Sequence, residues 1–156
     1  FRDSFDSIIL SAFLGLTVLT MYQNYNYIQN SVASFLLIIT ASITAGVGNS
    51  IAVESVEKNY ADFRKFTLLY MWICGVCTIC MAVLYQPFMQ IWVGEKLLFS
   101  FRIMLVFCLY FYTRKIGDIC YSYRQAAGLW KYDKLRPIIE SVINLVINIL
   151  WVKKVN

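Results

Sequence analysis

The stretch FTLLYMWICGVCTICMAVLYQ, residues 66–86, contains no charged side chain and decides the fold class of this chain. A helix needs about 20 predominantly apolar residues to cross a hydrocarbon core of about 30 Å. Four further stretches of the 156 residues are apolar over a similar length: 7–28, 32–53, 97–113 and 137–152. Because lipid offers backbone N–H and C=O groups no partner, such stretches are expected to be helices. The sequence therefore predicts an all-α polytopic membrane helix bundle: a single membrane-embedded region with about five transmembrane helices.

Composition favours this prediction over a soluble bundle of apolar helices. Hydrophobic residues make up 60% of the chain and charged residues 15%, whereas a soluble domain usually carries about 25% charged residues. A soluble helix normally has a charged face opposite its apolar stripe, and residues 7–28, 32–53 and 66–86 contain no charge at all. A β-barrel is less favoured still, because its strands would alternate in short segments.

The basic residues predict an orientation. If five helices alternate in direction, the N-terminal end shares one side with residues 54–65 and 114–136. That side holds 10 of the 14 Lys and Arg residues against 3 on the other, with Arg102 inside the fourth span. Lys and Arg concentrate on cytoplasmic loops, so 54–65 and 114–136 are expected in the cytoplasm, with Gly128 breaking any helix there. The net charge of +5 is a topology signal, and no nucleic-acid partner is expected.

No enzyme active site or cofactor site is visible in the sequence. Cys74, Cys77 and Cys80 form a C-x2-C-x2-C run that resembles iron–sulfur ligation, but they lie in an uncharged apolar helix and the chain has no His. Packing is the better interpretation of these cysteines. We therefore expect no catalytic residue, no metal and no cofactor.

Two polar stripes within the spans have the spacing of one helical face. Ser42, Gly46 and Ser50 recur at i, i+4 and i+8, where small residues permit close helix packing or form a polar stripe facing a lumen. Glu140, Asn144 and Asn148 show the same spacing in the last span. Glu140 follows Pro137 in the first turn, so it either stabilises the helix end or faces a cavity.

Polar residues near the ends of other spans leave similar alternatives open. Tyr and Asn residues cluster at 22–30, either as an interfacial aromatic belt or as sugar-binding chemistry. Arg102 either reaches to the interface or pairs with an anionic substrate group.

Seven motifs, in order along the chain, resemble Wzx-type polysaccharide flippases of the multidrug/oligosaccharidyl-lipid/polysaccharide exporter superfamily. They are SAFLGL (11–16), MYQNY (21–25), SITAGVGN (42–49), ESVEK (54–58), PFMQIWVG (87–94), YRQAAGLW (123–130) and RPIIESVINL (136–145). The resemblance implies that the chain is the seventh to eleventh transmembrane helices, part of the C-terminal lobe of a MATE-like exporter fold. The chain begins without Met and has an odd number of predicted helices, so a missing N-terminal lobe is expected as a partner within the same chain.

The resemblance also implies a function and candidate residues. Family members flip undecaprenyl-diphosphate-linked oligosaccharide repeat units across the bacterial cytoplasmic membrane by alternating access. The implied partners are the lipid bilayer and this lipid-linked oligosaccharide substrate. The candidates for the sugar-facing cavity are Glu140, Asn144, Asn148, Asn49, Asn24 and Tyr25, and those for the diphosphate are Arg124 and Arg102.

Two alternative functions would require other residues. A multidrug or cation antiporter of the same superfamily predicts carboxylates deep in the lobes, where Glu140 is the one candidate. A membrane-embedded polymerase or glycosyltransferase predicts a large extracytoplasmic loop or an Asp-rich cytoplasmic site, and the sequence contains neither.

Overall fold

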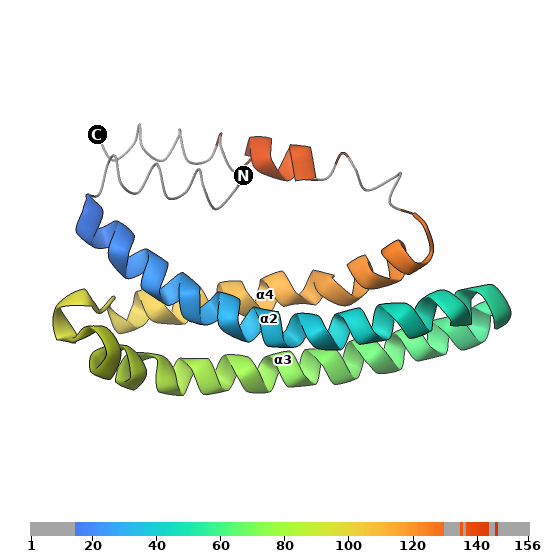
Figure 1. Ribbon diagram of the computed structural model, residues 1–156, viewed down its shortest axis with the longest axis horizontal. Coiled ribbons are helices and arrows are strands. Elements are labelled where there is room, and N and C mark those ends of the chain that lie inside the picture. The colour runs from blue at the N-terminus through green and yellow to red at the C-terminus, as the bar shows by residue number, and fades with distance from the viewer. Residues whose placement is uncertain (1–14, 130–134, 136, 144–145, 147–156) are drawn as a thin grey trace. The chain divides into compact units, whose positions relative to one another are not determined.

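The computed structural model describes residues 15–129, 135, 137–143 and 146 (Figure 1). The chain divides into two units, of which Tyr25–Leu129 is one; the other contains the described residues before Tyr25 and after Leu129. All regular structure among the described residues is helical. The all-α prediction is thus confirmed for this part of the chain.

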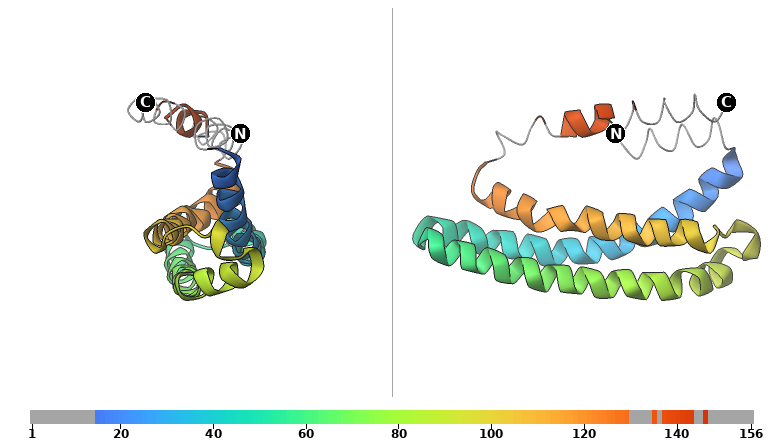
Figure 2. Two further views of the ribbon diagram at one scale, coloured as in Figure 1. Left: turned by 90° about the vertical axis from the view of Figure 1, so that its left-hand side faces the viewer. Right: turned by 180° about the vertical axis from the view of Figure 1, so that it is seen from behind.

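Three long helices and one short turn account for most of the described residues. Helix α2 spans Leu16–Val53, α3 spans Val56–Val93, the 3-10 turn η1 spans Glu95–Leu97 and α4 spans Phe101–Ala126. Within the 25–129 unit, α3 runs back along α2 and α4 returns along α3 (Figures 1 and 2). Helices α2 and α3 each contain 38 residues, which makes each about 57 Å long at about 1.5 Å per residue.

The predicted break between the spans 7–28 and 32–53 is wrong, because α2 passes through residues 29–31 without interruption. Gln29 is buried, and its side-chain amide donates to the Phe107 carbonyl at 2.6 Å. Ser31 donates its hydroxyl to the Tyr27 carbonyl one turn earlier. These polar side chains are therefore satisfied within helical structure. Gly15, directly before α2, has a positive φ of 84°, which glycine adopts without strain.

Two segments expected as connections are largely helical. Residues 56–65 form the first turns of α3, and α4 continues to Ala126, well beyond the expected end at residue 113. An apolar run marks only the part of a helix that fits a hydrocarbon core. Charged turns extend each helix beyond its apolar run, around Lys58 in α3 and around Arg124 in α4.

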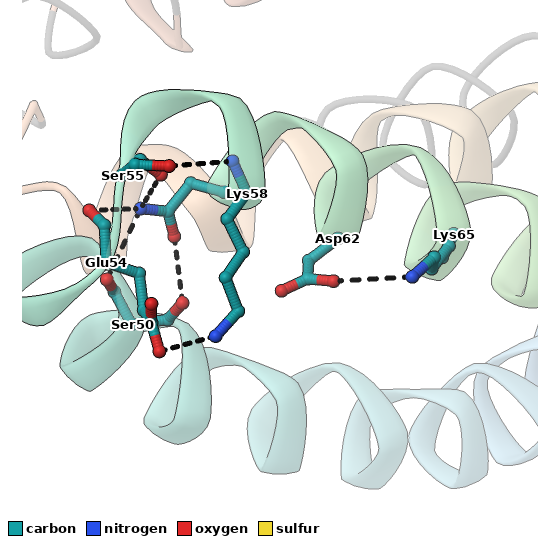
Figure 3. Close-up of polar contacts among 7 residues, drawn as sticks. Ser50, Glu54, Ser55, Lys58, Asp62 and Lys65 are labelled. Atoms are coloured by element: carbon teal, nitrogen blue, oxygen red, sulfur yellow. Dashed lines mark hydrogen bonds and ion pairs between the residues drawn. The ribbon is translucent and has the colours of Figure 1, made fainter.

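Hydrogen bonds hold the short turn between α2 and α3 (Figure 3). Ser55 caps α3 by accepting the Lys58 backbone N–H at 3.3 Å. The Asn59 side-chain amide donates to the carbonyls of Ser50, Glu54 and Ser55 at 3.1–3.3 Å. Ser50 returns its hydroxyl to Asn59 Oδ1 at 2.9 Å. The carbonyls of Ser50 and Ser55 also accept backbone N–H groups, from Glu54 and Asn59. The Asn59 amide therefore adds further hydrogen bonds that tie the end of α2 and the turn to α3.

The end of α4 agrees with the predicted role of Gly128. Its φ is +69°, its N–H donates to the Gln125 carbonyl at 3.0 Å, and Leu129 donates to the Arg124 carbonyl at 2.9 Å. This pair of bonds is a Schellman motif, in which glycine takes the left-handed position without strain. The prediction that Gly128 ends helical structure here is confirmed.

The core of the 25–129 unit is a seam in which one stripe of each helix is buried. Successive core residues on each helix are separated by three or four positions or by sums of these, which is the spacing of one helical face. The core residues are Tyr25, Leu36, Tyr70, Cys74, Met81, Tyr85, Met89, Met104, Cys108, Phe111 and Ile119.

Candidate functional site

A pocket of about 410 Å³ opens between α2, α3 and α4 at the end of the unit where α2 meets α3. Its volume lies within the range of about 300–1,000 Å³ that is typical of small-molecule sites. Its lining residues are Ser42, Ile43, Gly46, Val47 and Ser50 from α2, Asp62 and Phe66 from α3, and Tyr123 from α4. The stripe Ser42, Gly46 and Ser50 thus lines this pocket, and its predicted alternative as a polar stripe facing a lumen stays a prediction.

The polar groups of this pocket have unused acceptor capacity. Ser42 donates its hydroxyl to the Ile38 carbonyl at 2.9 Å and Ser50 donates to Asn59, so both hydroxyl oxygens can accept. The Asp62 carboxylate lies 3.9 Å from Lys65 Nζ (Figure 3), which is an ion pair longer than a hydrogen bond. The Tyr123 hydroxyl oxygen is buried without a hydrogen-bond partner.

A second polar cluster joins α3 to α4. Lys115 Nζ lies 2.8 Å from Asp118 Oδ2, and the Tyr70 hydroxyl donates to the same oxygen at 2.8 Å. The Lys115 side chain is only 10% exposed, and its ammonium group lies 6.0 Å from the centroid of the Phe111 ring. A buried charge is stable only when it is paired and hydrogen-bonded, so these groups depend on one another.

Two side chains near the α2–α3 turn have perturbed pKa values. A hydrogen bond to the Glu54 carboxylate raises the pKa of Lys58 above its usual 10.5. Burial, and secondarily the negative charge of Asp62, raise the pKa of Tyr123 above 10.0. Both groups are therefore protonated at neutral pH, and Tyr123 presents a neutral hydroxyl to the pocket.

Tyr25, expected to face sugar, is fully buried in the core. Its hydroxyl donates to Gln86 Oε1 at 3.1 Å and accepts the Phe99 N–H at 3.3 Å, and its ring lies 5.0 Å from that of Tyr85. Gln86 completes the network by donating its amide to the Phe99 carbonyl at 2.8 Å. This placement gives Tyr25 a packing role that ties α2 to α3 and to the segment that precedes α4.

The other predicted residues on the long helices do not converge on one site. Asn49 is exposed near the end of α2. Asn24 is half-buried on α2 and belongs to the other unit, which does not contain residues 25–129. Arg102 is exposed in the first turn of α4, whereas Arg124 is half-buried in its last turn. The two candidate diphosphate ligands thus lie at opposite ends of α4 and are not brought together.

Glu140 lies on a helical segment, residues 137–143, and is exposed there. It belongs to the unit that is separate from residues 25–129. Asn144 and Asn148 lie outside the described residues, so their alignment with Glu140 stays a prediction.

Sequence reasoning missed Asp62, Tyr70 and Asp118. The signal for the α3 residues was present: Asp62, Phe66, Tyr70 and Cys74 recur every four residues on one face. The polar residues 54–65 hide this periodicity, because hydropathy alone predicts a loop there. Lys115 and Asp118, at i and i+3, were likewise assigned to a connection.

Neither the pocket lining nor the cluster of Tyr70, Lys115 and Asp118 has the composition of a metal centre. Among the described residues no group of three His, Cys, Asp or Glu side chains is placed to hold a metal ion. Cys74 is buried, Cys77 is half-buried and Cys80 is exposed, and all three are free thiols.

Comparison with known proteins yields no relative: no family model, no curated protein and no solved structure matches this chain.

Proposed function

We propose that the chain is embedded in a lipid bilayer as part of a multi-pass membrane protein. Helices α2 and α3 are long and apolar enough to cross a membrane, yet only 18% and 17% of their apolar windows are buried within the structure. Leu68, Trp72 and Ile79 are 69%, 71% and 66% exposed. Contact with water would cost about 25 cal/mol for each Å² of such surface, a cost that lipid removes.

The charge distribution supports a cytoplasmic position for the end that carries the pocket. Among the described residues of the 25–129 unit, Lys58, Arg64, Lys65, Arg114, Lys115 and Arg124 lie in the halves of α3 and α4 next to that end. Lys96 and Arg102 lie near the other end. The cytoplasmic excess of Lys and Arg places the pocket end inside the cell under this proposal.

The function that we propose is flipping of undecaprenyl-diphosphate-linked oligosaccharide units across the bacterial cytoplasmic membrane. The ordered series of motifs that resembles the polysaccharide flippases carries this proposal. The structure adds an antiparallel helical unit with an apolar exterior and, at its basic end, a mainly apolar pocket that carries the polar groups of Ser42, Ser50, Asp62 and Tyr123.

One observation favours a multidrug or cation antiporter as the second candidate. That function needs carboxylates within the helical unit, and Asp118 lies there beside Tyr70. Lys115, however, already compensates the Asp118 charge at 2.8 Å, which leaves less attraction for a cationic substrate. The antiporter therefore ranks below the flippase.

Complementation tests this proposal. The gene that encodes the chain is expressed with the cognate glycosyltransferases in a host lacking its own surface-polysaccharide flippase. Restored surface polymer is the expected result. Glu140→Gln should abolish it at unchanged membrane levels, whereas Glu57→Gln, an exposed carboxylate of the first turn of α3, should not. Absence of polymer together with raised resistance to cationic drugs would favour the antiporter.

A further inference from the structure

Three of the four polar side chains that line the pocket between α2, α3 and α4 can only accept further hydrogen bonds, and the fourth, the Tyr123 hydroxyl, can donate or accept. The oxygens of Ser42 and Ser50 have already given their protons to protein acceptors, and Asp62 can only accept. Asp62 is the one charged residue among those that line the described pocket, so the lining has a net negative charge. A ligand that fits must therefore bring several donors and a positive charge, which a primary ammonium group does.

The one carboxylate of the lining, Asp62, lies nearer the helix ends than the apolar side chains of Ile43 and Phe66, whereas the Ser42 hydroxyl lies at the level of Ile43. Ser50 lies in the last turn of α2, near Asp62 and Tyr123, which belong to the charged ends of α3 and α4. Ile43 and Phe66 line the pocket farther from the helix ends, and Ser42 is about 12 Å along α2 from Ser50 at about 1.5 Å per residue. A ligand with a cationic head at the interface and an apolar body directed inward matches this order.

We propose that this pocket binds the headgroup of an aminophospholipid, with the ammonium group on Asp62 and the Tyr123 hydroxyl. Basic side chains beside the pocket suit the phosphate of the same lipid. Lys65 is 75% exposed and lies 3.9 Å from Asp62, so it can leave the carboxylate to the ammonium group and pair with the phosphate. A free lipophilic amine shares the ammonium chemistry but has no phosphate for Lys65. The inference rests on the proposed membrane embedding and is independent of the proposed transport activity.

Lipid binding to the purified full chain tests the assignment. Native mass spectrometry in detergent measures apparent affinities for phosphatidylethanolamine, phosphatidylglycerol and phosphatidylcholine with identical acyl chains. Phosphatidylethanolamine should bind most tightly, because phosphatidylglycerol has no cation and the quaternary ammonium of phosphatidylcholine has no N–H donor. Asp62→Asn should weaken phosphatidylethanolamine binding by about tenfold, or about 1.4 kcal/mol, and leave phosphatidylglycerol unchanged.

Two further variants separate charge from shape. Glu57→Gln removes an equal charge from an exposed position on α3 that does not line the pocket, so it should retain wild-type lipid preference. Gly46→Met should block the pocket without changing its charge, since a Cβ at Gly46 meets nothing within 4 Å. Helicity by circular dichroism and a single size-exclusion peak establish that each variant folds.

Three results would overturn the assignment. The first is equal binding of the three lipids to wild type, and the second is retained preference for phosphatidylethanolamine in both Asp62→Asn and Gly46→Met. The third is tight, Asp62-dependent binding of dodecylamine without binding of phosphatidylethanolamine, which would make a free amine the ligand. Loss of surface polymer in the complementation assay bears on transport alone, so the two proposals fail separately.

Discussion

Replacing Asn59 by Ala should destabilise the α2–α3 hairpin by about 1–2 kcal/mol. The Asn59 amide donates to three carbonyls at 3.1–3.3 Å and its oxygen accepts from Ser50 at 2.9 Å. An amide has two hydrogens, so these contacts amount to about two donated bonds and one accepted bond. A net value of about 0.5–1.5 kcal/mol for each bond is reduced here because Asn59 is half-buried and water can replace part of what is lost.

The matching Asp substitution makes this test sharper. Asn59→Asp keeps the size and the acceptor for Ser50 but removes the donor and brings a carboxylate against the three carbonyls. It should destabilise the protein more than Asn59→Ala does. Asn49→Ala is the control, because Asn49 is an exposed asparagine on α2 and alanine has the higher helix propensity. Thermal unfolding in detergent, followed by circular dichroism, measures all three. Wild-type stability of Asn59→Asp would refute the reasoning, because the donated bonds would then contribute nothing.

Three other predictions follow from the polar contacts. Tyr25→Phe keeps the buried ring but removes a hydroxyl with two hydrogen bonds, so it should cost about 1–2 kcal/mol in the same unfolding assay; no loss would show that the network is weak. Asp118→Asn should cost about 2 kcal/mol by leaving Lys115 unpaired, and adding Lys115→Met should restore most of that stability; a double variant less stable than the single one would contradict this. Because Glu54 raises the pKa of Lys58, the stability that this pair contributes is fully present below pH 10.5 and is lost as pH rises through the raised value. Glu54→Gln should lower the Lys58 pKa in an NMR titration, and an unchanged value would contradict the assigned cause.

The sequence predicted helical structure correctly but placed the helix ends by hydropathy. Residues 66–86 are helical as expected, yet α3 begins at Val56 and continues through Pro87 to Val93. Pro87 has no N–H, so the Val83 carbonyl lacks its usual helical donor. The predicted span ends at Gln86, directly before this proline. Hydropathy measures what fits a hydrocarbon core. Helix ends depend instead on local caps, here Ser55 at the start of α3 and a glycine of positive φ at Gly94.

The candidate site was predicted less completely, for a related reason. The spacing of Ser42, Gly46 and Ser50 predicted one polar or close-packing face, and that face does line a pocket. Tyr25 shows the limit of the same reasoning, since an aromatic ring with a hydroxyl suits both sugar binding and a buried network. Only the positions of Gln86 and Phe99, more than sixty residues away in the chain, distinguish the two.

The continuity of α2 bears on how this unit would sit in a bilayer under the proposed embedding. Gln29 and Ser50 are separated by about 32 Å along the helix at about 1.5 Å per residue, which is close to the thickness of a hydrocarbon core of about 30 Å. The buried network around Tyr25 and Gln29 would then lie near one interface, and the pocket with Ser50 and Asp62 near the other. Residues 30–49 would make one crossing, and residues 16–28 and 32–53 belong to one continuous helix rather than to two helices of opposite direction. The pairing of the basic halves of α3 and α4 at one end does not depend on that count, because it follows from contacts such as Tyr70 to Asp118 and Phe63 to Tyr123. The orientation therefore rests on the three-helix unit itself rather than on the number of spans that precede it.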